Sequence, residues 1–294
     1  MQTQSYIDIV TMQTQSKGSH EYNDLYKNEF HAGGSQVRFQ PGHGKLLAVA
    51  NKNVINIISV KTFNLLKILQ GHVKDIYSIC WDSRGQWIAS ASEDEVCIWS
   101  LMMDGECLYQ YSATGKKFKC IIFHPRYRNV LVIGSLQCME LLIFEVGQVL
   151  NKRISDLPTT GLADCMQNGL IASTTTSNDS VLFICNVETN RSLTTSESHS
   201  LSIFEVRFQP GSTIFATSSY ANTVKLWNAE RHERSVFEFV GHNERGMELL
   251  VIDVGGLLIK HVPGLPTTGL AACMQNEFIA STTSGIDSMV NIWK

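Results

Sequence analysis

The stretch QGHVKDIYSICWDSRGQWIASASEDEVCIW, residues 70–99, sets the pattern for the rest of the chain. It opens with Gly71-His72 and continues as three short apolar runs, which are separated by DSRG and by the acidic EDE. Alternating apolar and polar positions, interrupted by turn residues every few positions, predict consecutive antiparallel strands. We therefore expect strands over residues 76–81, 87–92 and 96–99, with a fourth over residues 107–111.

This stretch resembles a WD repeat, one four-stranded blade of a β-propeller, because Gly-His stands at one end and Trp at the other. In WD-repeat proteins a His, a Ser or Thr, an Asp and the Trp indole form a hydrogen-bonded relay. The resemblance gives these roles to His72, Ser90 or Ser92, Asp94 and Trp99. A buried carboxylate is costly unless donors meet its charge, so we interpret the relay as structural. A catalytic role is disfavoured, since no nucleophile accompanies the His–Asp pair.

The composition is that of an ordinary globular protein, with 294 residues, a net charge of −3, 17% charged residues and 44% hydrophobic residues. This length suits one large all-β domain or two small ones. The absence of a strong basic excess argues against direct nucleic-acid binding. No apolar run approaches the roughly 20 residues that a membrane helix needs, and the first residues lack the features of a secretory signal.

Eight cysteines are spread along the chain, and no two of them form a Cys-x-x-Cys pair. Most lie within apolar runs, as small core residues do. We therefore expect reduced, buried thiols in a cytosolic or nuclear protein, with no zinc site, other metal or cofactor. The sequence GHGK at residues 42–45 departs from a phosphate-binding loop, and we interpret it as a hairpin turn.

The repeats divide the chain into a polar leader, residues 1–32, and a propeller, residues 33–294. Residues 6–10 alternate, and we expect them to supply a strand that closes the last blade. Candidate third strands recur seven times, which predicts an all-β WD-repeat β-propeller of about seven blades. One blade is incomplete, because the second Gly-His, at residues 241–242, is followed almost at once by a third-strand pattern.

A long internal copy accounts for this irregular sixth blade. Residues 139–180 and 247–288 align without gaps, and 26 of the 42 positions are identical. The copied unit spans the end of one blade and the start of the next, so we interpret it as a segment duplicated in the gene.

The relay is complete only in the blade of residues 70–99. The blade that ends at Trp227 has Ala221 in the place of the Asp, and another blade has Cys185 in the place of the Trp. A lost net hydrogen bond costs about 1 kcal/mol. We therefore expect several blades to be held by packing alone and the stability to be marginal.

Longer stretches resemble the C-terminal WD-repeat domain of the LEUNIG-type transcriptional corepressors of plants. The resemblance covers most of residues 34–294 and extends to the loops. Here the FEVRFQP-type blade follows the QVRFQP-type blade, whereas the family has the opposite order, and we find no counterpart of the family's N-terminal LisH-type region. The similar stretches are QVRFQPGHGKLLAVANKNVINIISV, LQGHVKDIYSICWDSRGQWIASASEDEVCIWSL, GECLYQYSATGKKFKCIIFHP, NVLVIGSLQCMEL and FEVRFQPGSTIFATSSYANTVKLWNAE.

The resemblance implies a non-enzymatic nuclear scaffold that docks on transcription-factor complexes, with transcription factors and co-repressors as its partners. Two alternatives stay open: a substrate-recruiting subunit of a ubiquitin ligase, and a rearranged gene copy with little activity. A cytoplasmic location is also compatible with the sequence.

Propellers usually bind partners on the face where loops enter the innermost strands. A Tyr or Phe at such a position is equally compatible with a place in the core. Residues 116–128 also form a basic cluster, which we interpret as solvated loop ends, with a patch for an acidic partner as the alternative. The residues that we expect on this face are Asp75, Tyr77, Lys116, Lys117 and Phe204.

Overall fold

The structure is a computed structural model, and the prediction of an all-β fold is confirmed. The described residues form strands β1 to β26 and no helix, and so none of them belongs to a helix that could cross a membrane. They are residues 27–30, 36–42, 44–145, 148–156, 158–165, 169–175, 182–186, 191–194, 199–201, 203–209, 212–219, 221, 223–230, 235–240, 247–253, 256–262, 267–273, 278–283 and 290–293.

The strands pair antiparallel into seven sheets within the described residues, six of four strands and one of two. In each of blades 1 to 5, neighbouring strands of the sheet are consecutive in the sequence, as expected for a series of hairpins. Blade 1 contains β2 (Gln36–Phe39), β3 (Leu46–Asn51), β4 (Val54–Ser59) and β5 (Leu65–Gln70). Blade 2 contains β6 (Ser78–Trp81), β7 (Trp87–Ala91), β8 (Glu95–Ser100) and β9 (Glu106–Ser112). Blade 3 contains β10 (Phe118–Phe123), β11 (Val130–Ser135), β12 (Met139–Glu145) and β13 (Gln148–Ser155).

The remaining blades complete the set. Blade 4 contains β14 (Gly161–Cys165), β15 (Leu170–Thr174), β16 (Leu182–Asn186) and β17 (Arg191–Thr194). Blade 5 contains β18 (Ile203–Phe208), β19 (Ile214–Ser219), β20 (Thr223–Asn228) and β21 (Phe237–Val240). Blade 6 is the two-stranded sheet of β22 (Met247–Asp253) and β23 (Gly256–Val262). Blade 7 contains β24 (Thr267–Cys273), β25 (Phe278–Thr283), β26 (Val290–Trp293) and β1 (Lys27–Phe30).

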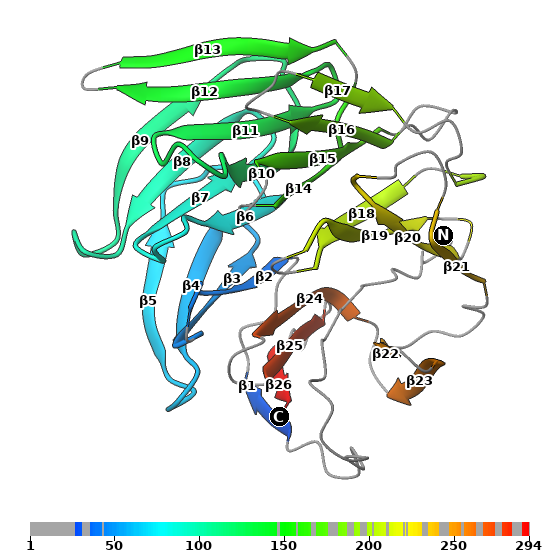
Figure 1. Cartoon of the computed structure of the whole chain (residues 1–294). Coiled ribbons are helices and arrows are strands. Elements are labelled where there is room, and N and C mark those ends of the chain that lie inside the picture. Colours follow the sequence, from blue (N-terminus) through cyan, green and yellow to red (C-terminus); the bar gives the residue numbers. More distant parts are fainter. Residues whose placement is uncertain are drawn as a thin grey trace, which may run out of the picture. The chain divides into compact units, whose positions relative to one another are not determined.

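The chain divides into two compact units. One consists of residues 71–243 and holds blades 2 to 5, and the other consists of residues 1–70 and 244–294 and holds blades 1, 6 and 7. In the first unit the leading strands β6, β10, β14 and β18 contact one another in sequence, so that its four sheets lie side by side (Figure 1).

Burial differs between the middle and the outer strands of a blade. All residues of β8 and β11 are buried, because neighbouring sheets cover both of their faces, whereas the last strand β9 has none buried. The core between blades 2 and 3 is apolar and includes Ile98, Phe118, Ile121, Leu131 and Leu142.

Gly134 marks a close approach between blades 3 and 4. A Cβ atom at this position of β11 would lie 2.4 Å from Cys120 Sγ and 2.7 Å from the Thr159 carbonyl oxygen. Only glycine fits beside the loop that leads into β14.

The internal copy folds as its sequence predicts. Strands β22 to β25 reproduce the order of β12 to β15, and the pairing has the same register from Glu140 and Glu248 onward. In the first copy Leu142 pairs with Asn151, and in the second Leu250 pairs with Ile259. The two-stranded blade 6 agrees with the predicted incomplete blade.

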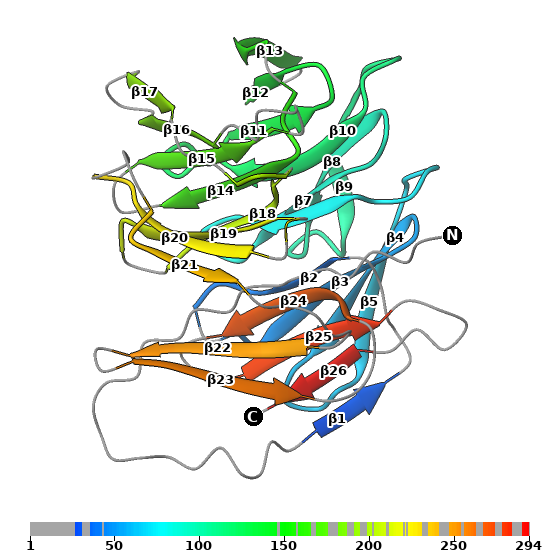
Figure 2. The same ribbon diagram turned by 90° about the vertical axis from the view of Figure 1, so that its right-hand side faces the viewer.

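A strand from the N-terminal region completes blade 7. β1 pairs antiparallel with β26, with Lys27 opposite Trp293 and Phe30 opposite Val290 (Figure 2). We expected residues 6–10 to supply the closing strand, and these residues lie outside the described part of the chain. The strand that pairs with β26 is β1, which comes later in the sequence. The pairing joins segments from near both ends of the chain in one sheet.

Candidate functional site

A hydrogen-bonded relay connects the loop before β6 with β7 and β8 in blade 2. His72 Nε2 lies 2.6 Å from Ser90 Oγ, and the Trp99 Nε1–H group donates to the same oxygen over 2.8 Å. On the other side of the imidazole, His72 Nδ1 lies 2.8 Å from Glu95 Oε2. The relay therefore ties the loop to both middle strands.

The direction of these hydrogen bonds follows from the chemistry of the groups. Burial lowers the pKa of His72, although the Glu95 carboxylate acts in the opposite direction, so the imidazole is neutral at pH 7. A carboxylate only accepts, so Nδ1 carries the hydrogen and Nε2 accepts from the Ser90 hydroxyl. This arrangement suits a structural role.

The acid of the relay differs from our expectation. Asp94 forms an ion pair with Lys74 over 3.2 Å, and 43% of its side chain is exposed, so Glu95 takes the place that we predicted for Asp94. The longer Glu side chain reaches the imidazole from the first position of β8. Ser92 is buried but donates to the carbonyl oxygen of Glu95 over 3.3 Å, which leaves Ser90 as the hydroxyl of the relay.

Blade 5 contains a second relay that the sequence analysis missed. His199 Nε2 lies 2.7 Å from Thr217 Oγ1, and Trp227 Nε1–H donates to this oxygen over 2.7 Å. His199 Nδ1 lies 2.6 Å from Thr223 Oγ1, so a hydroxyl stands where blade 2 has a carboxylate. A threonine hydroxyl both donates and accepts, and either imidazole tautomer satisfies this neutral relay.

Sequence spacing was the signal for the second relay. His199 and Thr217 are 18 positions apart, as are His72 and Ser90. His199 follows a serine instead of the usual glycine, and Thr223 is not an acid, so a search for Gly-His and Asp overlooked it. Burial and the nearby Lys225 ammonium lower the pKa of His199 to about 4.

The loops that enter the leading strands of blades 2 and 3 form one connected surface, which we call the entry-loop face. It consists of residues 71–77, 92–94, 113–117 and 135–138. The Phe118 N–H group donates to the Glu93 carbonyl over 3.0 Å, and the Leu136 N–H group donates to the Lys117 carbonyl over 3.1 Å. These backbone bonds fix neighbouring loops to each other.

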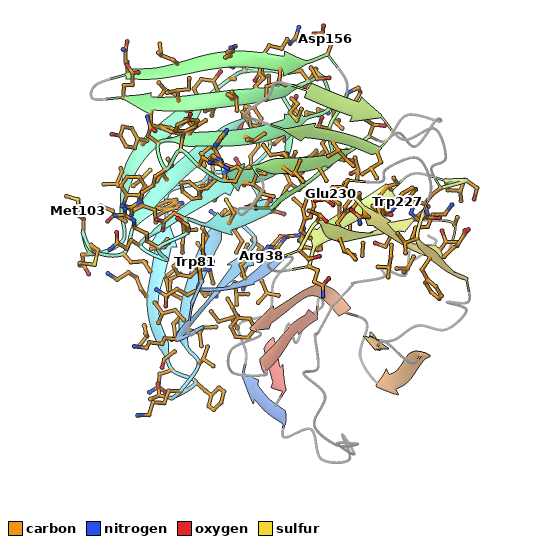
Figure 3. The ribbon with its side chains drawn as sticks, in the orientation of Figure 1. Arg38, Trp81, Met103, Asp156, Trp227 and Glu230 are labelled. Carbon is orange, nitrogen blue, oxygen red and sulfur yellow. The ribbon has the colours of Figure 1, made fainter. Side chains whose placement is uncertain are left out.

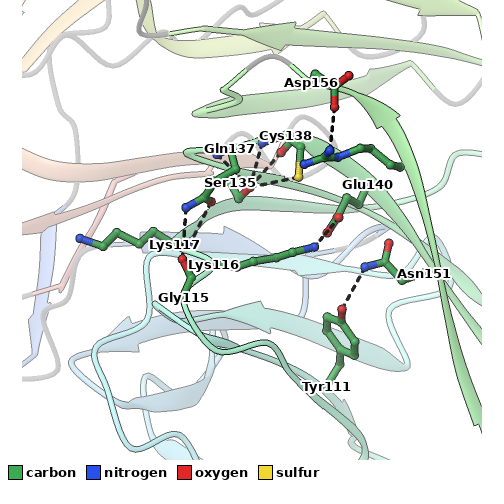
Figure 4. A network of polar contacts seen from close by, with 11 residues as sticks. Tyr111, Gly115, Lys116, Lys117, Ser135, Gln137, Cys138, Glu140, Asn151 and Asp156 are labelled. Atoms are coloured by element: carbon green, nitrogen blue, oxygen red, sulfur yellow. Dashed lines mark hydrogen bonds and ion pairs between the residues drawn. The ribbon is translucent and has the colours of Figure 1, made fainter.

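Side chains reinforce the same surface (Figure 4). Gln137 donates to the Gly115 carbonyl over 3.1 Å, and the Lys116 ammonium forms an ion pair with Glu140. Burial acts to raise the pKa of Glu140, but the Lys116 ammonium together with hydrogen bonds from Asn151 and Cys138 outweighs this effect, and the net shift is downward. The ion pair with Glu140 anchors Lys116 within the loop, and its part in a partner surface stays a prediction.

The other residues predicted for the partner surface have different surroundings. Asp75 and Lys117 are exposed. Tyr77 is 39% exposed, and the Lys119 ammonium lies 3.9 Å from the centre of its ring, a cation–π contact that holds it in place. Phe204 belongs to β18, but its side chain lies outside what the structure describes.

Apolar side chains that the sequence analysis did not single out also project from the entry-loop face. Val73 is 87% exposed and Leu136 is 38% exposed. Exposed apolar and aromatic residues are enriched at protein-binding surfaces. Met102 and Met103 are also exposed, but they lie in the turn between β8 and β9, at the other end of β8 from the entry-loop face. Figure 3 shows Met103 far from Asp156, which precedes β14.

The basic cluster at residues 116–128 is not simply a set of solvated loop ends. Arg128 Nε donates to the buried Asp82 carboxylate over 2.9 Å, and its guanidinium lies 4.0 Å from the centre of the Trp87 ring. Asp82 also accepts from the backbone N–H groups of Gln86 and Trp87, over 2.7 and 2.6 Å. This arrangement, the Asp82–Arg128 clamp, joins the first turn of blade 2 to blade 3.

Known sequence families and structures support the same architecture. The family model "WD domain, G-beta repeat" matches residues 63–100 and 190–228, and each segment includes a relay tryptophan one position before its end. The β-propeller domain of Cps50 (Swd1) from Myceliophteria thermophila superposes with a TM-score of 0.76 and 16% identity, covering 92% of this chain and 99% of that one. The fold is a WD-repeat β-propeller.

Curated relatives match part of the propeller. The transcriptional corepressor LEUNIG_HOMOLOG of Arabidopsis thaliana is 36% identical over 140 residues, which is 47% of this chain and 18% of that protein. The Set1 complex component swd1 of Schizosaccharomyces pombe is 29% identical over 119 residues, which is 40% of this chain and 29% of that protein. The chain thus spans less than a third of each relative, and the propeller is similar to parts of transcriptional and chromatin proteins.

Proposed function

We propose that the propeller is a non-enzymatic scaffold of a nuclear complex that regulates transcription, and that it binds a protein partner through the entry-loop face. The observation that carries the proposal is a surface of mutually hydrogen-bonded loops with exposed apolar groups. Its loops are joined by backbone hydrogen bonds, while Val73 is 87% exposed. A pre-organised surface loses little conformational entropy when a partner binds.

The relatives support the class of partner. One is a transcriptional corepressor and the other is a component of the Set1 complex. By analogy, we expect transcription factors and co-repressors to bind this propeller. The histidines of both relays are engaged in holding strands together, which supports a binding role for the protein over an enzymatic one.

Affinity purification from nuclear extract of the source organism tests the proposal. We expect the full chain to recover subunits of a transcription-regulating complex. A Val73→Glu/Leu136→Glu variant should recover at least tenfold less, because two charges would enter an apolar contact. Thermal unfolding of the variant checks that the fold is intact.

The matched control is Met102→Glu/Met103→Glu. These methionines are 78% and 54% exposed at the other ends of the strands, so their replacement adds the same charges to a different surface. The control should recover the complex at the level of the unmodified chain. Equal loss in both variants, or recovery of cullin adaptors in place of transcriptional proteins, would contradict the proposal.

A further inference from the structure

Metal-binding atoms converge beside the relay of blade 2. One donor atom from each of His72, Glu95 and Cys97 lies within 4.8 Å of the others, and all three residues are buried. Cys107 of the adjacent strand β9 lies outside this group of three, but its thiol is hydrogen-bonded to that of Cys97. A nitrogen, a carboxylate and two thiols form a donor set that suits Zn²⁺.

The surrounding groups orient these donors as in many metal sites. Ser90 Oγ contacts His72 Nε2, which leaves the other ring nitrogen facing the cluster. The Gln110 side chain donates to Glu95 Oε1, so that Oε2 faces His72. Hydrogen bonds of this kind fix the orientation of ligands in metalloproteins.

Blade 5 shows that the relay itself does not require these donors. Its histidine, threonine and tryptophan make the same contacts as His72, Ser90 and Trp99, but Thr223 contacts the imidazole in place of Glu95. Two positions after Thr223 stands Lys225, whereas two positions after Glu95 stands Cys97. A hydroxyl can therefore take the place of the carboxylate in the relay, and the thiols are additional to what holds the strands.

We propose that blade 2 binds one thiophilic divalent ion, Zn²⁺ being the best match, through His72 Nδ1, the Glu95 carboxylate and the thiolates of Cys97 and Cys107. Ligand atoms around tetrahedral zinc are roughly 3.4–3.8 Å apart. His72 Nδ1 and Glu95 Oε2, which are 2.8 Å apart, would therefore separate slightly, while Cys97 Sγ, within 4.8 Å of both, would move closer. When the ion binds Nδ1, the imidazole hydrogen moves to Nε2 and is donated to Ser90 Oγ, whose own hydroxyl hydrogen turns away from the ring, and the two thiols release their protons. Cys97 and Cys107 are ten positions apart, which explains why a search for Cys-x-x-Cys pairs does not find them.

Cobalt and zinc titrations of the metal-free full chain, kept in a reductant without thiols, test the site. We expect one Co²⁺ per chain with a thiolate-to-cobalt charge-transfer band, and displacement of the Co²⁺ by Zn²⁺. Cys97→Ser and Cys107→Ser should each remove part of this band and weaken Zn²⁺ binding at least ~10-fold. Zn²⁺ should also raise the melting temperature of the unmodified chain.

Cys80→Ser and Cys138→Ser are the matched controls, since Cys80 is half-buried in the same blade and Cys138 is buried in the next. Both should keep the band and the affinity. Cys107 is exposed, so its variant keeps the fold and carries the test if Cys97→Ser unfolds. The proposal is wrong if no charge-transfer band forms, if the band survives Cys107→Ser unchanged, or if the controls lose it equally.

Discussion

At the scale of single residues, two nearby serines have different roles: Ser90 in β7 belongs to the relay, and Ser92 in the turn after β7 does not. Ser90 contacts both His72 and Trp99, whereas Ser92 donates to one backbone carbonyl over 3.3 Å. Ser90→Ala leaves the buried indole N–H group without its acceptor, and we expect a loss of about 2–3 kcal/mol in the free energy of unfolding. Ser92→Ala should cost about 1 kcal/mol. Urea unfolding measures both, and equal losses would contradict the assignment of the relay hydroxyl.

The second relay predicts a dependence of stability on pH. The pKa of His199 is about 4 in the folded chain and about 6.5 when unfolded, so the unfolded state binds more protons as the pH falls between these values. The contribution of His199 is therefore fully present above pH ~6.5 and is lost toward pH 4, by up to about 3 kcal/mol. Urea unfolding at a series of pH values should show a shallower loss for His199→Gln, and an unchanged profile would disprove the buried neutral imidazole.

At the scale of elements, the Asp82–Arg128 clamp shows where local sequence stops being informative. The turn DSRG and the end of a first strand at Trp81 were predictable from residue types, and β6 does end there. The partner of Asp82 lies 46 positions away, in a loop that residue types alone describe as solvated. Contacts between blades depend on how the sheets stack, which no local pattern encodes.

The clamp also yields a stability prediction. Asp82→Ala removes the acceptor of several backbone N–H groups and leaves Arg128 without its carboxylate, so we expect a loss of about 3–5 kcal/mol. Asp75→Ala, at an exposed position, should change stability by less than about 0.5 kcal/mol. Thermal or urea unfolding compares the two, and a similar small effect of both would show that the clamp does not hold the blades together.

At the scale of the whole molecule, the sequence was most informative where patterns repeat. Period-two alternation predicted the strands, and the 26 identities between the two copied segments predicted the same strand order in both. The sequence was less informative where one residue type replaces another in the same role. Glu95 replaces the expected Asp, and His199 with Thr223 form a relay without any acid, because geometry and hydrogen-bonding capacity decide these roles.

The central claim is that this propeller serves as a surface for other proteins and that the entry-loop face makes the contact. Site-specific photo-crosslinking in nuclear extract tests it most directly, with the crosslinker placed at position 73 or 136 and, for comparison, at position 102 or 127. The account predicts that positions 73 and 136 capture the same transcription-regulating protein while positions 102 and 127 do not. Capture of that protein only from positions 102 and 127 would contradict it.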